Sequence, residues 1–148
     1  MENVLIGALL HCPRPPEARR QALEILELLG LAPLCHRPAA SLTLPERKRL
    51  ELARALATRP RLLLLDEPSL GLAPLVVKQI FQVVADINRE RGMTVFMVEQ
   101  NARRALKLAH RAYVMVNGVI TLSGSGGELL ADESVRAAYL EGGHGKTG

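Results

Sequence analysis

Apolar residues in the first third of the chain recur every three or four positions, the spacing of one helical face. One such series ends at Gly30, a residue placed as a helix C-cap, and includes Ala18, Ala22, Ile25, Leu26 and Leu29. A second helix is predicted from Thr43 to about Thr58. Thr43 and Glu46 have the spacing of a capping box, and Pro45 falls in the first turn, where its missing N–H is tolerated.

The period changes after residue 60. Leu62–Leu65 and Thr94–Val98 are short continuous apolar runs, typical of strands buried on both faces. Between them, a helix is predicted from Pro74 to near Gly92, with an apolar face made by Val77, Ile80, Phe81, Val84 and Ile87. A strand, a crossover helix and a second strand form a βαβ unit, so we expect parallel strands in an α/β layer fold.

Shorter elements are predicted beyond residue 100. A helix is expected over residues 102–109, followed by a hairpin in which Ala112–Val116 and Val119–Ser123 are joined by Asn117-Gly118. Gly124, Gly126 and Gly127 are interpreted as a turn. Two short helices, near residues 128–131 and 135–140, complete the prediction.

Composition narrows the functional classes. The 148 residues are 48% hydrophobic and 23% charged, the balance of a soluble globular domain, and no apolar run approaches the ~18 residues of a membrane span. The net charge of +4 and an aromatic content of 3% argue against nucleic acid as a partner. His11-Cys12 and Cys35-His36 lack the C-x2-C spacing of zinc sites, so we favour chance adjacency over a metal site.

Two acids at the end of a predicted strand carry the clearest chemistry. Asp66 and Glu67 follow four leucines, so they stand where α/β sheets bind ligands. An apolar strand ending in Asp is the Walker B pattern, in which the carboxylate holds the Mg²⁺ of a nucleotide. Glu67 has the chemistry to orient or deprotonate a water. The alternative is a strand that ends in solvent with two exposed acids.

Longer stretches resemble a known family. Residues 42–56, LTLPERKRLELARAL, resemble the signature motif and following helix of ABC-type ATPases, and residues 62–73, LLLLDEPSLGLA, resemble their Walker B strand, catalytic Glu and D-loop. The MVEQN and LSGSGGELL segments are most similar to ATP-binding subunits of branched-chain amino-acid uptake transporters. The resemblance implies a partial P-loop NTPase fold of the α/β class, with a parallel βαβ core, an N-terminal helical subdomain (residues 1–58, with the signature helix) and a core half with a C-terminal β-hairpin (residues 59–148).

The resemblance also implies residue roles and partners. Asp66 would serve Mg²⁺, Glu67 would be the general base, and Gln100 would stand in place of the switch histidine. The D-loop would be Leu70, Gly71, Leu72 and Ala73, and the signature that caps the γ-phosphate of the partner's ATP would be Thr43, Leu44, Pro45 and Glu46. The implied setting is a cytoplasmic subunit on the inner face of the membrane, paired with a second ATP-binding subunit and a permease, and served indirectly by a substrate-binding protein.

The sequence departs from the family pattern at several places. No G-x-x-x-x-G-K-[ST] loop precedes a helix, and no Q-loop glutamine is found, so we expect the C-terminal portion of an ATP-binding subunit and no hydrolysis by these residues alone. Leu44-Pro45 replaces the usual glycine pair, and Ala73 replaces the D-loop acid. Gly145-Lys146-Thr147 resembles the end of a P-loop, but Leu140 stands where its first glycine would be.

Three hypotheses therefore remain. The first is an ATPase subunit of an importer, specific in the intact transporter for branched-chain amino acids. The second is a non-catalytic module that binds a permease or an ATPase subunit. The third is an unrelated α/β binding protein that acts on nucleic acid, with the basic helix binding phosphates. We otherwise interpret the basic run Arg47-Lys48-Arg49 as a solvated helix face. Under the first hypothesis, bare strand edges and bare apolar faces would make the isolated chain poorly soluble or oligomeric.

Overall fold

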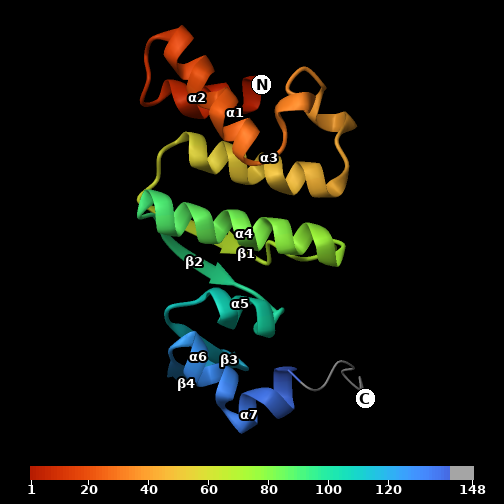
Figure 1. The fold of residues 1–148 in the computed structure, drawn as a ribbon, viewed down its shortest axis with the longest axis vertical. Coiled ribbons are helices and arrows are strands. Elements are labelled where there is room, and N and C mark those ends of the chain that lie inside the picture. Colours follow the sequence, from red (N-terminus) through yellow and green to blue (C-terminus); the bar gives the residue numbers. More distant parts are fainter. Residues whose placement is uncertain (141–148) are drawn as a thin grey trace. The chain divides into compact units, whose positions relative to one another are not determined.

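A computed structural model describes residues 1–140 and divides the chain into two compact units. The first is Met1–Phe96, and the second begins at Met97. Figure 1 follows both units along the chain. The P-loop-like segment at residues 145–147 lies outside the described residues.

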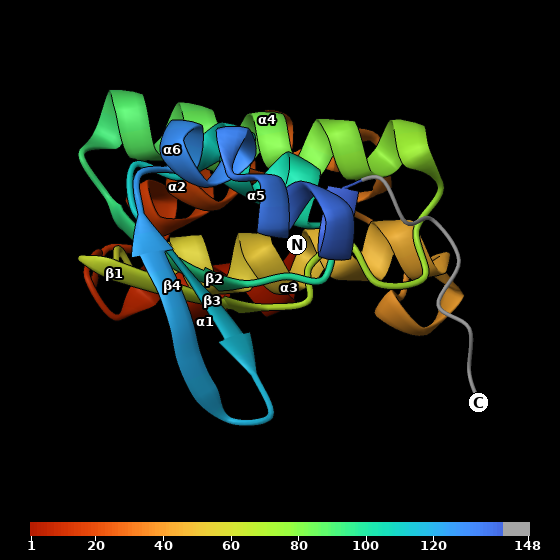
Figure 2. The same ribbon diagram turned by 90° about the horizontal axis from the view of Figure 1, so that it is seen from below.

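Three helices form the N-terminal part of the first unit: α1 (Glu2–Leu9), α2 (Pro15–Leu28) and α3 (Leu44–Ala57). They pack on one another, and two short 3-10 turns, Ala32–Leu34 and Ala39–Ser41, connect α2 to α3 (Figures 1 and 2). Their shared core includes the predicted apolar face of α2, with Ala18, Ala22, Ile25, Leu26 and Leu29 all buried. This confirms the helical period of the segment.

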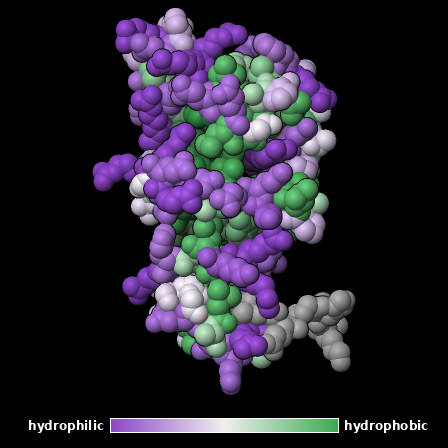
Figure 3. All heavy atoms as spheres, in the orientation of Figure 1, coloured by the Kyte–Doolittle hydropathy of each residue, from purple (hydrophilic) through white to green (hydrophobic). Residues whose placement is uncertain are grey.

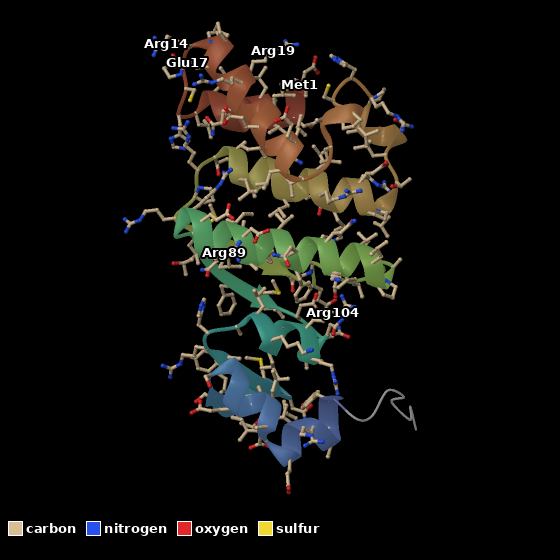
Figure 4. All side chains as sticks on the ribbon, viewed as in Figure 1. Met1, Arg14, Glu17, Arg19, Arg89 and Arg104 are labelled. Carbon is tan, nitrogen blue, oxygen red and sulfur yellow. The ribbon has the colours of Figure 1, made fainter. Side chains whose placement is uncertain are left out.

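The ends of these helices follow the local sequence. An ion pair of 2.6 Å joins Arg14 and Glu17 at the start of α2 (Figure 4), and Gly30 has φ +65° just beyond its end. In α3 the predicted capping box of Thr43 and Glu46 is formed, and Pro45 lies in the first turn. The capping box satisfies backbone N–H groups that the start of a helix leaves without partners.

The remainder of the first unit contains strand β1 (Leu62–Asp66), helix α4 (Pro74–Arg91) and the start of strand β2 (Thr94–Val98). The strands are neighbours in a two-stranded sheet. The amide of Thr94 donates to the carbonyl of Arg61 at 3.1 Å, so both strands begin side by side and run parallel. Gly92 ends α4 with φ +60°, and the predicted apolar face of α4 is buried.

Burial of the two strands is less complete than predicted. Leu63 is buried against the helical core, whereas Leu62, Leu64 and Phe96 are 50%, 67% and 55% exposed. The prediction of strands buried on both faces is therefore wrong for the described residues. The physical reason is that successive side chains of a strand point to opposite sides, and the helical core packs on one side.

The second unit contains α5 (Ala102–Leu108), a hairpin of β3 (Ala112–Val116) and β4 (Val119–Gly124), α6 (Gly126–Ala131), α7 (Glu133–Val135) and a π-helical turn over Arg136–Leu140. The hairpin is antiparallel, with a bulge between Val114 and Met115. Asn117 and Gly118 have φ +49° and +80°, as a two-residue hairpin turn requires. Leu106, Leu129 and Val135 form the core.

One glycine segment of the second unit differs from its prediction. Gly126 and Gly127 were predicted to form a loop turn, but they belong to the first helical turn of α6. The reason is a capping box of Ser125 and Glu128, in which the amide of Ser125 donates to Oε2 of Glu128 at 2.7 Å. Because Ser125 caps the backbone at this point, a helix begins at Gly126 within the glycine-rich segment.

Polar side chains dominate the visible face of the molecule, with apolar groups between them (Figure 3). Among the described residues, no helix combines the length and the apolar character needed to cross a membrane.

Candidate functional site

The two predicted acids lie where β1 ends. Asp66 is the last residue of the strand and is exposed, and Glu67 follows it with φ +43°. A positive φ is uncommon for a residue with a side chain and marks a tightly determined backbone. Pro68, which is buried, comes next. The strand end thus presents one carboxylate outward and turns the chain sharply at the second.

A tight loop connects the acids to α4. The amide of Leu70 donates to the carbonyl of Glu67 at 3.1 Å, and the amide of Leu72 donates to the carbonyl of Ser69 at 3.2 Å. Gly71 has φ +74°, a conformation that glycine adopts without strain. These bonds fix residues 70–73, the predicted D-loop, directly between the acids and the N-cap of α4 at Ala73.

The predicted signature contacts this loop. A Cβ built on Gly71 would lie 3.5 Å from Cδ2 of Leu44, so the first residue of α3 is a direct neighbour of the D-loop. The structure therefore brings together three motifs of the sequence prediction: the start of α3, the D-loop and the acids at the end of β1.

The start of α3 keeps its helical cap but loses a donor. The amide of Thr43 donates to Oε2 of Glu46 at 2.7 Å, and this hydrogen bond is the main reason why the pKa of Glu46 lies below its ordinary value. Helix N-termini bind anions through free backbone N–H groups. Pro45 has none, so one donor that a phosphate would use is missing.

The basic run in α3 differs from the prediction of a solvated face. Arg47 is exposed, but Lys48 and Arg49 are half-buried. Arg49 points inward, because its Nη1 donates to the carbonyl of Leu29 at 3.4 Å. Arg49 therefore ties α3 to the end of α2, a role that the charge pattern alone did not reveal.

An open hollow of about 190 Å³ lies between α3, β1 and α4, and its lining includes Lys48, Glu51 and Asp66. Its volume is below the roughly 300–1,000 Å³ of small-molecule sites, so this hollow does not enclose a nucleotide. Sequence reasoning did not link Lys48 to Asp66. The two residues belong to different elements and are far apart in the chain, so no periodic or motif signal connects them.

A metal at this end of the sheet would have few protein ligands. No cluster of three or more His, Cys, Asp or Glu suited to a metal is present in residues 1–140. Mg²⁺, however, keeps several waters and takes one or two carboxylates plus substrate phosphates. The exposed carboxylate of Asp66 fits such a site, while the phosphate-binding loop is not in the sequence.

Gln100 belongs to the second unit. It is exposed, and it follows β2 directly before α5, whose first amide, at Ala102, donates to the carbonyl of Gln100 at 2.8 Å. The amide of Asn101 donates to Oε2 of Glu99 at 2.9 Å. These two bonds shape the loop that carries Gln100 between β2 and α5.

Comparison with known proteins agrees with these motifs. Residues 1–70 match the family model described as ABC transporter. The chain is 56% identical over 97 residues to the high-affinity branched-chain amino acid transport ATP-binding protein BraG of Pseudomonas aeruginosa, covering 66% of this chain and 41% of BraG. It is 35% identical over 126 residues to the lipopolysaccharide export system ATP-binding protein LptB of Haemophilus influenzae, covering 85% of this chain and 52% of LptB. The chain therefore spans about half the length of these relatives.

Solved structures show the same fold. The ADP conformation of MJ1267, an ATP-binding cassette of an ABC transporter, matches with a TM-score of 0.74 at 30% identity, over 95% of this chain and 62% of that one. The dimeric post-hydrolysis state of the cassette MJ0796 bound to ADP and Pi matches with a TM-score of 0.67 at 27% identity, over 74% and 47%. The fold is that of the P-loop NTPase class, as expected, and the chain belongs to the family of ABC transporter ATP-binding subunits.

Proposed function

We propose that this chain forms part of the ATP-binding subunit of an importer for branched-chain amino acids. The observation that supports the proposal is a contact within the first unit: Leu44, at the start of α3, lies against Gly71, in the loop that follows the acids at the end of β1. The substrate class is supported by the 56% identity to BraG over 97 residues, against 35% over 126 residues for LptB of Haemophilus influenzae.

Each motif has a role in this proposal. ATP with Mg²⁺ supplies the phosphoryl group that is transferred to water. Asp66 would hold the cation through water, and Glu67 would take a proton from the attacking water. Gln100 would donate a hydrogen bond to a phosphate oxygen, without the positive charge that a histidine can carry.

The proposed partners follow from the same motifs. The D-loop, residues 70–73, would face a second ATP-binding subunit, and the start of α3 would approach the nucleotide of that subunit. Residues 1–58 would act as the helical subdomain and residues 59–148 as the core half. The assembly would lie on the cytoplasmic face of the membrane, bound to permease subunits, with a substrate-binding protein as an indirect partner.

A second candidate function is a non-catalytic module that binds a permease or ATPase subunit without hydrolysing ATP. One observation favours it: Pro45 removes a phosphate donor from the start of α3. Under this proposal the helix start is retained for its shape and contacts, and not for nucleotide binding.

A chimera separates the two candidates. The segment of P. aeruginosa BraG that aligns with this chain is replaced by residues of this chain, and radiolabelled leucine uptake is measured in a strain that lacks BraG. Uptake is expected for the first candidate. The matched variant Glu67→Gln is expected to lower ATP hydrolysis by about 10²–10⁴-fold, the usual worth of a general base, while ATP binding persists.

The remaining outcomes decide between the proposals. If the chimera is inactive and the double substitution Leu44→Gly with Pro45→Gly restores uptake, the start of α3 has lost its nucleotide function and the non-catalytic module is supported. If neither form supports uptake although the purified chimera binds ATP, the branched-chain substrate class is wrong.

A further inference from the structure

The loop between β2 and α5 has three residues, Glu99, Gln100 and Asn101. Glu99 is half-buried, whereas Gln100 is exposed. Oε2 of Glu99 accepts a hydrogen bond from the amide of Asn101, two residues further along the chain, at 2.9 Å. Because a carboxylate is a stronger acceptor than a neutral group, this bond restrains the loop that carries Gln100.

The backbone at Asn101 forms an inverse γ-turn. Its φ and ψ are −76° and 67°, and the amide of Ala102 donates to the carbonyl of Gln100 at 2.8 Å across the turn. The carbonyl of Asn101 accepts the amides of Arg104 and Ala105, each at 3.0 Å, and Asn101 is the N-cap residue of α5. The loop is therefore held by the backbone on its helix side and by the carboxylate of Glu99 on its strand side.

The peptide group between Gln100 and Asn101 is held at both of its polar atoms. Its carbonyl oxygen accepts the Ala102 amide, and its N–H donates to Glu99. A peptide group is planar, so holding both atoms fixes its orientation and with it the angle ψ of Gln100. The direction in which the Gln100 side chain leaves the backbone is thus set by two hydrogen bonds, one of which Glu99 supplies.

We propose that Glu99 is a positioning residue for Gln100, because its carboxylate fixes the peptide group that aims the Gln100 side chain at a phosphate oxygen. This inference rests on the proposed function for the role of Gln100. Without the carboxylate, the Asn101 amide loses this acceptor, and the loop is released on its strand side. A displacement of about 1 Å in a group that acts on the reacting atoms costs about 10²-fold in rate, so the release is expected to lower kcat.

Amide hydrogen exchange of the 148-residue chain, followed by NMR, tests the contact without any activity. The Asn101 amide is expected to exchange at least about tenfold faster in Glu99→Ala, since a hydrogen bond to a charged acceptor is removed. Glu99→Gln keeps a side-chain oxygen of the same reach and should preserve most of the protection. Unchanged exchange of Asn101 in Glu99→Ala would overturn the proposal.

ATP hydrolysis tests the effect on Gln100. The assay uses a chimera of H. influenzae LptB in which this chain replaces the aligned segment; a match of 126 residues must include the middle of a 148-residue chain, and with it Glu99. Glu99→Ala should lower kcat by about 10–100-fold, and Glu99→Gln should recover most of the loss. In a Gln100→Ala background, Glu99→Ala should cost little more, because it acts through the side chain already removed.

Glu128 provides a matched control in the same unit. Its Oε2 likewise accepts a backbone amide, that of Ser125, at 2.7 Å at the start of α6. Glu128→Ala removes the same kind of bond and is expected to leave both kcat and the exchange of Asn101 unchanged. The proposal is rejected by an equal loss of kcat in Glu128→Ala, or by a loss in Glu99→Ala that is as large without the Gln100 side chain as with it.

The proposed function and this inference fail in different ways. If the chimera with Glu99 intact hydrolyses no ATP, the ATPase function is rejected, while faster exchange of Asn101 in Glu99→Ala still supports Glu99 as the residue that fixes the loop. If the chimera hydrolyses ATP and Glu99→Ala leaves its kcat unchanged, the positioning role is rejected and the ATPase function stands.

Discussion

Replacing Gly126 by alanine is expected to destabilise the second unit, because the N-terminus of α6 lies against the C-terminus of α5. A Cβ at this position would overlap the carbonyl oxygen of Leu106 and would lie 2.5 Å from that of Ala109. Both contacts are far below van der Waals distance and both are to backbone atoms. The clash cannot be relieved by rotating a side chain, so the helices must separate.

The size of the effect follows from comparison with a neighbouring glycine. Overpacking typically costs about 1–3 kcal/mol, and two backbone contacts place Gly126→Ala at the upper end, about 3 kcal/mol. Gly127 lies in the same turn of α6, and a Cβ added there would meet no atom within 4 Å. Gly127→Ala removes backbone freedom from the unfolded chain and should stabilise the unit by up to about 1 kcal/mol.

Tyrosine fluorescence is the appropriate assay. The chain has two tyrosines and no tryptophan, and both Tyr113 and Tyr139 lie in the second unit. Urea unfolding followed by tyrosine emission therefore reports this unit, while circular dichroism reports all helices. Gly126→Ala should lower the tyrosine midpoint, and Gly127→Ala should keep or raise it. Equal midpoints for the two variants would refute the close approach of α5 and α6.

Three further predictions concern stability. Hydrogen bonds from the helix caps lower the pKa values of Glu46 and Glu128. The stability that each carboxylate contributes is therefore present above the ordinary pKa of 4.5 and is lost as the pH falls through the lowered pKa of the folded state. Replacing either residue by Gln should flatten the pH dependence of the urea midpoint below about pH 5. Gly7→Ala should cost about 1–3 kcal/mol by circular dichroism, since its Cβ would lie 2.9 Å from that of Ala57 in α3. Leu63→Ala should cost about 2–5 kcal/mol and Leu62→Ala less than about 1 kcal/mol, and equal losses in thermal unfolding would contradict the one-sided burial of β1.

The elements that sequence predicted well are those whose causes are local. Thr43 and Glu46 are three residues apart, and their hydrogen bond sets the start of α3 without help from the rest of the chain. Asn117-Gly118 likewise fixes the hairpin through its own backbone angles. The apolar face of α4 was also predictable, because helical period and burial coincide there.

Features that depend on distant contacts were missed. Arg49 has the same charge as Arg47, and only the position of the carbonyl of Leu29 makes it an inward-pointing residue. Gly126 follows a glycine-rich pattern typical of turns, but the carbonyls of α5 give it a packing role. Neither partner is close in sequence, so neither contact leaves a periodic or motif signal.

The candidate site was predictable in its placement and less so in its chemistry. The acids end β1 as the apolar run indicated. A glycine pair at a helix start offers both a backbone that suits the helix and free N–H groups for a phosphate, whereas Leu44-Pro45 keeps the first property and loses one of the N–H groups. Proline suits the first turn, because its φ of about −65° is already helical, and Thr43 still caps the helix. A phosphate, by contrast, needs the N–H that proline lacks. The shape of α3 is therefore compatible with either proposed function, and the chemistry of these two positions, tested by restoring glycine, decides between them.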